Sequence, residues 1–146
     1  MEFTWTYEKL GLFTYHLLSD EQIKPYMMQH IMAVLRTDDV ESPGQIWTKE
    51  WIDALPRMRF DLEVLPLERV QPRSDLMAFE NEEENFYEDL LERAAEREEA
   101  LFRGVSTEPL LVNREGYELM DGHTRYVVFT RHWQEFTYAY VGTVVE

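Results

Sequence analysis

Cysteine is absent from the 146 residues of the sequence. Disulfide bonds, thiolate metal sites and cysteine nucleophiles are therefore excluded. Long apolar runs are missing as well, and none approaches the roughly 18 residues that a membrane-spanning helix needs. The N-terminus has neither a basic start nor an apolar segment of the kind that forms a secretory signal. We therefore expect a cytoplasmic protein that does not enter a membrane.

Positive charge is scarce, since 14 Lys and Arg residues stand against 29 Asp and Glu residues, for a formal net charge of −15. Proteins hold the phosphate backbone of nucleic acids through clustered cations, so this balance argues against DNA binding. It argues equally against docking on an anionic membrane surface. Hydrophobic residues make up 45% of the chain and aromatic residues 14%, which is enough to build a folded core.

The negative charge is concentrated in one segment. Residues 80–100 carry a net charge of −8, against −5 for residues 1–79 and −2 for residues 101–146. Apolar residues recur through this segment at helical spacing, namely Phe79, Phe86, Leu90, Ala94 and Leu101. We predict one acidic helix that ends near Gly104, a residue suited to a helix C-cap. Its charged face is either simply solvated or recruits a basic partner.

Residues 1–58 are predicted to form a mostly helical N-terminal extension. Ser19, Asp20 and Glu21 look like a helix start, with Pro25 in the first turn, and a second short helix is expected after Thr48. Several large apolar side chains of this extension are most simply core, or else form a surface for self-association through the N-terminal helices. These are Met27, Met28, Met32, Trp47 and Trp51.

Residues 59–146 alternate between strand and helix patterns, which indicates an α+β domain. Apolar and polar residues alternate from Phe60 to Val64, as in a half-buried strand. Residues 110–112 and 117–120 are predicted to pair around a turn at 113–116, and a helix is expected at 123–132. A last strand pair is predicted over residues 136–145.

The junction around Asp121 and Gly122 carries the chemistry of greatest interest, because a strand runs through a glycine turn directly into a helix. The first N–H groups of a helix have no intrahelical acceptor and favour an anion such as phosphate. His123 and Arg125 add donors on the same turn. Asp121 is open to three roles: helix cap, general base or Mg²⁺ ligand. A purely structural turn is the alternative.

Four short stretches in order resemble the ParB/sulfiredoxin-like superfamily. They are Leu65–Pro72, Gly104–Val105, Pro109–Val112 and Tyr117–Tyr126. Members of that superfamily have a strand followed by a proline loop, a helix ending in glycine, a hairpin, and a strand ending in Asp-Gly-x-x-Arg. The resemblance covers about residues 60–142 and implies a small mixed sheet with helices, to which residues 1–58 are an addition.

What this resemblance implies is nucleotide binding, with ATP or ADP and Mg²⁺ as the expected ligands. The phosphate contacts carry over to Gly122, His123, Thr124 and Arg125. Sulfinic-acid reduction of the sulfiredoxin kind is excluded because the chain has no cysteine. The partition ParB proteins have a Gly-Glu-Arg-Arg-x-Arg motif at this place, which this chain lacks, so DNA clamping is not expected.

By motif the sequence is most similar to the free serine kinases of the superfamily, whose turn reads Asp-Gly-His-His-Arg where this chain has Asp-Gly-His-Thr-Arg. Those kinases carry a catalytic Glu shortly after the proline of the first loop. Here the matching carboxylate is Asp75, with Glu68 as the other candidate in the loop. The implied function is phosphate transfer to a small hydroxyl substrate, with Asp121 holding Mg²⁺ or positioning that substrate. The alternative is a non-catalytic module for nucleotide sensing or protein interaction.

Overall fold

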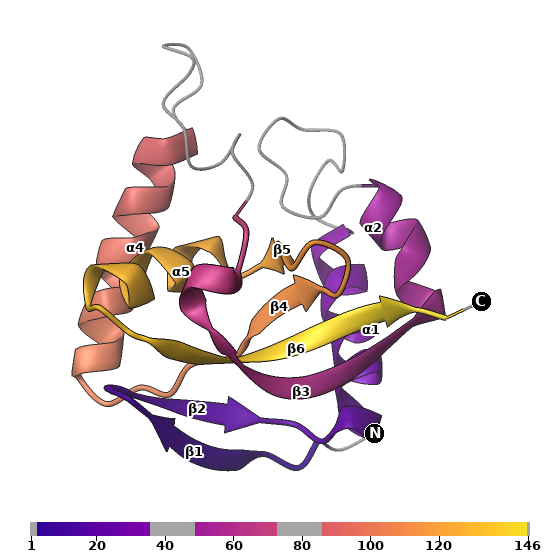
Figure 1. Ribbon diagram of the computed structural model, residues 1–146, viewed down its shortest axis with the longest axis horizontal. Helices are drawn as coiled ribbons and strands as arrows, with labels where there is room; N and C mark the ends of the chain where they lie inside the picture. The colour runs from indigo at the N-terminus through magenta and orange to yellow at the C-terminus, as the bar shows by residue number, and fades with distance from the viewer. Residues whose placement is uncertain (1–2, 36–48, 73–85, 146) are drawn as a thin grey trace.

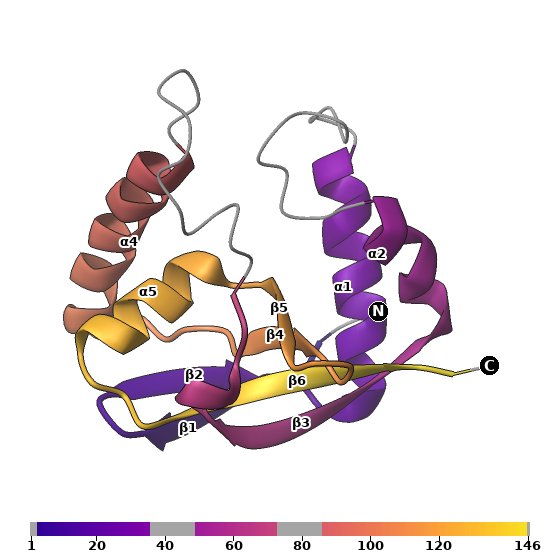
Figure 2. The same ribbon diagram turned by 45° about the horizontal axis from the view of Figure 1, so that its top comes forward.

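The computed structural model describes residues 3–35, 49–72 and 86–145. The described chain has the predicted α+β composition. A four-stranded sheet lies in the middle (Figures 1 and 2). Helices α4 (Phe86–Phe102) and α5 (His123–Arg131) lie at one end, and helices α1 (Asp20–Leu35) and α2 (Lys49–Ala54) lie at the other. No helix in these described ranges is long and apolar enough to cross a membrane.

The central sheet has the strand order β3-β6-β4-β5. Its strands are β3 (Met58–Pro66), β4 (Leu110–Asn113), β5 (Glu118–Asp121) and β6 (Phe136–Val144). The β3–β6 and β4–β5 pairs are antiparallel, whereas β4 and β6 are parallel. The predicted turn joins β4 to β5. Because β5 is an edge strand, the Gly122 junction that follows it lies at the edge of the sheet.

The expected strand pair at residues 136–145 is a single strand, β6, so that prediction is wrong. Gly142 lies within this strand. A Cβ at Gly142 would come within 2.5 Å of Met58 Cε and 2.7 Å of Phe60 Cε1, on the neighbouring strand. This glycine therefore provides close side-chain packing rather than a turn.

Helices α4 (Phe86–Phe102) and α5 (His123–Arg131) pack against each other over the sheet (Figure 2). The acidic helix ends as predicted. Gly104 has φ +95°, and the bonds from Gly104 N to Leu101 O and from Val105 N to Ala100 O form a Schellman motif. Residues 80–85 of the predicted helix lie outside the described residues.

The N-terminal residues begin with an antiparallel hairpin, formed by β1 (Thr6–Leu10) and β2 (Phe13–Leu17), and the prediction of a mostly helical extension is wrong here. Alternate residues of β2 are buried, namely Phe13, Tyr15 and Leu17. Gly11, with φ +64°, allows the tight turn between the strands. In a strand, alternate side chains point to the same face. Burial of these three side chains in the core therefore favours the hairpin.

The two predicted helices of the extension are present as α1 (Asp20–Leu35) and α2 (Lys49–Ala54). The carbonyl of Ser19 accepts the N–H groups of Gln22 and Ile23, which begins α1 where expected. Pro25 lies inside the helix, past the first turn in which it was predicted. A short 3₁₀ turn, η1 (Leu55–Arg57), connects α2 to β3, and a second, η2 (Leu67–Arg69), follows β3.

Both hydrophobic clusters of the core contain residues from 1–58 and from 59–146. One cluster joins the hairpin to α5 and the sheet, with Phe13, Tyr15, Val128 and Phe129 among its buried members. The other joins α1 and α2 to the opposite face and includes Met27, Trp51, Met120 and Tyr140. The core reading of Met27 and Trp51 is thus confirmed, whereas Trp47 and the side chain of Met32 lie outside the description.

Candidate functional site

The Gly122 turn joins the end of β5 to the start of α5. Gly122 is the N-cap residue, has φ +105° and is buried. The first intrahelical bond runs from Tyr126 N to Gly122 O at 2.8 Å, and no side chain caps the helix. Asp121 belongs to β5, so the idea that it caps the helix is wrong. The first N–H groups of a helix such as α5 have no acceptor within the helix.

Arg125 folds back across this turn. A Cβ at position 122 would lie 2.7 Å from Arg125 Nη2 and 2.8 Å from Leu110 Cδ2, so only glycine fits. The guanidinium is therefore held at the helix start, with Arg125 only 7% exposed. Its Nη1 donates to Glu108 Oε2 at 3.2 Å, while its buried Nε has no hydrogen-bond partner among the described residues.

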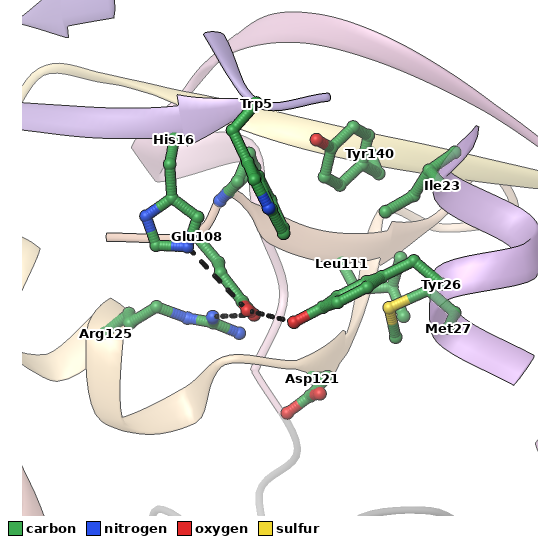
Figure 3. A pocket seen from close by; sticks show the side chains of 11 residues that line it. Trp5, His16, Ile23, Tyr26, Met27, Glu108, Leu111, Asp121, Arg125 and Tyr140 are labelled. Atoms are coloured by element: carbon green, nitrogen blue, oxygen red, sulfur yellow. Dashed lines mark hydrogen bonds and ion pairs between the residues drawn. The ribbon is translucent and has the colours of Figure 1, made fainter. Parts of the chain in front are cut away.

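The carboxylate of Glu108 collects three polar side chains from distant parts of the sequence (Figure 3). Besides Arg125, Tyr26 Oη donates to Glu108 Oε1 at 2.8 Å, and His16 Nε2 lies 3.8 Å from the same oxygen. His16, followed by Arg125 and Tyr26, lowers the pKa of Glu108 to about 2 against the opposing effect of burial. Glu108 is thus held as an anion at neutral pH.

Backbone pairing explains why these side chains meet. His16 N donates to Thr107 O, and Thr107 N donates to Thr14 O, both at 2.9 Å, so β2 runs beside the residue that precedes Glu108. Ser106 Oγ lies 2.9 Å from His16 Nδ1 and fixes the ring. Helix α1 supplies Tyr26. Sequence reasoning missed Glu108, His16 and Tyr26, because nothing in their local sequence indicates these long-range contacts.

A small cavity lies beside this cluster. Its walls combine apolar and aromatic side chains, among them Trp5, Ile23 and Tyr140, with the carboxylates of Glu108 and Asp121 (Figure 3). The enclosed space for the centre of a water molecule is about 20 Å³, enough for about one water. Any larger ligand must therefore bind at the rim, next to Arg125 and Asp121.

A second arginine approaches from α4. Solvent reaches much of Arg97, yet partial desolvation, and then the positive charge of Arg125, lower the pKa of Arg97, while Glu108 and Asp121 act in the opposite direction. Within the described residues Arg97 forms no ion pair. Arg97 and Arg125, on the neighbouring helices α4 and α5, therefore carry like charges that repel each other. The local sequence does not mark Arg97 as part of a site, since it lies among the acidic residues of the predicted helix.

The predicted site residues are brought together in part. Gly122, His123, Thr124 and Arg125 form the first turn as expected, but His123 is buried, at 1% exposure, rather than presented to solvent. Asp121 lines the small cavity with Arg125. Glu68 lines a different groove, described below, and Asp75 lies outside the described residues.

Asp121 is the residue that is expected to bind Mg²⁺. Across the described ranges, no three His, Asp or Glu side chains form a cluster that could hold a metal ion. Asp121 supplies oxygen atoms of the kind that Mg²⁺ prefers. Because Mg²⁺ is commonly held by one or two carboxylates together with phosphate oxygens, Asp121 fits this ion as a partner of a bound nucleotide.

Comparison with known proteins yields similarity of structure only. No protein-family model matches the chain, and the search of curated proteins gives no match. Two solved structures of a pNOB8-like ParB N-domain are similar to it, at 18% and 17% identity and a TM-score of 0.43 each. The matches cover 59% of this chain and 31% and 28% of those chains. These similarities assign neither a family nor a ligand to the chain.

Proposed function

We propose that the chain binds the phosphates of a nucleotide at the start of α5, in the region that faces Arg97 of α4. The observation that carries this proposal is the placement of Arg125, which lies across the Gly122 turn with a buried Nε that no described residue accepts from. A phosphate oxygen is an acceptor suited to a guanidinium and to the N–H groups of a helix start. Arg97 adds a second cation, which forms no ion pair with any other residue that the structure describes.

Selectivity for an anion would come from oriented donors more than from net charge. Glu108 and Asp121 offset the two arginines, so the site is not strongly basic. Phosphate has several acceptor oxygens, which can engage Arg97, Arg125 and the Thr124 amide together. Mg²⁺ bound by the phosphates would relieve the charge of Asp121.

Phosphate transfer to a small hydroxyl substrate is the finer proposal. Asp121 and Glu108 are the two carboxylates that line the same cavity as Arg125. Because Glu108 is bonded to Arg125, Asp121 is assigned to Mg²⁺ and to positioning the acceptor hydroxyl. The catalytic base stays assigned to Asp75 or Glu68. Non-catalytic nucleotide sensing is the second candidate, and it is favoured by the cavity, whose 20 Å³ holds about one water rather than a substrate.

Isothermal titration calorimetry with ATP, ADP and CTP, each with Mg²⁺, tests the binding proposal. We expect Arg97→Met to weaken binding about tenfold, or about 1.4 kcal/mol. Arg103→Met is the matched control, since Arg103 is an exposed arginine at the end of the same helix, 3.9 Å from Glu99. Absence of binding at millimolar nucleotide, or equal affinities of the two variants, would reject the site. Release of ADP in the presence of free serine would then separate transfer from sensing.

A further inference from the structure

A second hollow lies at the C-terminal end of α5, where η2 meets the beginning of β6. It is an open groove of about 620 Å³, lined among others by Leu67, Glu68, Tyr126, Trp133, Glu135 and Phe136. The bond from Leu67 N to Glu135 O, at 2.9 Å, fixes its two sides to each other. The groove is separate from the cavity at Glu108, and the nucleotide proposal uses only Glu68 of its lining, as one of two candidates for the catalytic base.

Trp133 occupies a backbone position that favours glycine. The bonds from Gln134 N to Phe129 O and from Trp133 N to Thr130 O form a Schellman motif at the end of α5, with Trp133 at φ +55°. The same motif at the end of α4 has Gly104 in this place. A bulky residue is strained in the left-handed region, and the side chain of Trp133 is 92% exposed. Packing within the chain therefore does not account for this tryptophan.

The groove is acidic as well as aromatic. Its charged lining consists of Glu68 and Glu135, and both are exposed. The arginines beside them are engaged elsewhere: the Arg69 guanidinium lies 4.7 Å from the centre of the Tyr117 ring, and Arg131 pairs with Glu98 at 3.6 Å. Two carboxylates are thus left to face whatever enters the groove.

We propose that this groove docks an extended segment of a partner protein in which Lys or Arg lies beside an apolar residue. The carboxylates of Glu68 and Glu135 complement the cation, and Trp133 offers its ring face both to that cation and to the apolar side chain. Exposed tryptophan is typical of the residues that dominate binding energy at interfaces. A second copy of this chain is disfavoured as the occupant, because its net charge is also −15.

The experiment selects ligands from a displayed library of random peptides of about 12 residues, with the full chain as bait. We expect recovered peptides to carry Lys or Arg next to Leu, Phe or Trp. Trp133→Gly should weaken their binding about tenfold or more while the midpoint of urea unfolding stays the same or rises, a combination that loss of a structural side chain does not produce. Tyr7→Ala is the control, because Tyr7 is an exposed aromatic residue on β1, at 63% exposure.

The charge component is tested with the double variant Glu68→Gln and Glu135→Gln, which should weaken the same peptides and reduce the salt dependence of their binding. Several outcomes overturn the proposal. They are recovery of no peptide above background, recovery of acidic peptides, and equal binding by wild type and Trp133→Gly. A wild-type dimer that Trp133→Gly converts to a monomer would also overturn it, since the groove would then be an interface between copies.

Discussion

The carboxylate of Glu108 accepts a hydrogen bond from Arg125 at 3.2 Å, across the start of α5. An anion of the chain itself thus engages one edge of the guanidinium that the sequence assigns to phosphate. The remaining edge, which includes Nε, is turned toward the Gly122 turn. An external phosphate would bind beside a fixed negative charge, and the affinity of the site would depend on that charge.

Replacing Glu108 should therefore strengthen nucleotide binding. Glu108→Gln keeps the shape and an acceptor for Arg125 but removes the negative charge, and we expect ATP affinity to rise about fivefold. Glu115→Gln is the matched control, because it changes the net charge equally at an exposed turn between β4 and β5. Calorimetry on the two variants measures the effect. Weaker binding by Glu108→Gln would mean that the carboxylate contacts the ligand or its Mg²⁺ directly.

The same carboxylate makes folding stability depend on acid pH. The pKa of Glu108 is lowered from 4.5 to about 2 in the folded state. Its contribution is therefore complete above about pH 5 and is lost as the pH falls toward about 2. Because the side chain of Glu108 is 37% exposed, solvent screens its interactions, and we expect a contribution of about 1–2 kcal/mol to the free energy of unfolding. Urea unfolding between these pH values should show a steeper loss for wild type than for Glu108→Gln. Parallel curves would contradict the assignment.

Local patterns predicted much of the fold. Alternation at Phe60 to Val64 identified β3, and the strand, glycine turn and helix around Gly122 were found from adjacent residues. The hairpin was missed because the spacing of Leu10, Phe13 and Leu17 also fits a helix. The strand is favoured by Gly11 in the turn and by the burial of alternate residues in the core. That burial cannot be read from the sequence.

Only the part of the site around the Gly122 turn was predictable from the sequence. Gly122 and Arg125 are close in sequence and form a recognisable turn, so their proximity follows from local geometry. Glu108 and Tyr26 are 82 positions apart, and their hydrogen bond depends on how α1 packs over the sheet. Neither has a neighbour that marks it as functional. The carboxylate of Glu108, which lies beside the expected phosphate-binding turn, could therefore be recognised only in the tertiary structure.

Gly122 should tolerate no side chain. Gly122→Ala would place a methyl group 2.7 Å from Arg125 Nη2 and 2.8 Å from Leu110 Cδ2, at φ +105°. Gly104→Ala is the control for backbone strain alone, since Gly104 has φ +95° and nothing within 4 Å. We expect a loss of about 1 kcal/mol for Gly104→Ala and about 2–3 kcal/mol for Gly122→Ala, measured by urea unfolding. Equal losses would show that Arg125 does not lie against the turn.

Tyr140 ties the end of the hairpin to the central strand of the sheet. Its Oη accepts the N–H of Leu18 at 2.7 Å and donates to the Leu18 carbonyl at 3.3 Å, and both residues are buried. Tyr140→Phe leaves that N–H buried without an acceptor, so we expect a loss of about 1–3 kcal/mol. Tyr138→Phe, two residues earlier on β6, should cost less than about 0.5 kcal/mol. The described residues 3–18 share the core with β6, so urea unfolding should remain one transition by fluorescence and by circular dichroism. If Tyr140→Phe separated the two signals, the hairpin would be an independent unit instead of part of the same cooperative fold.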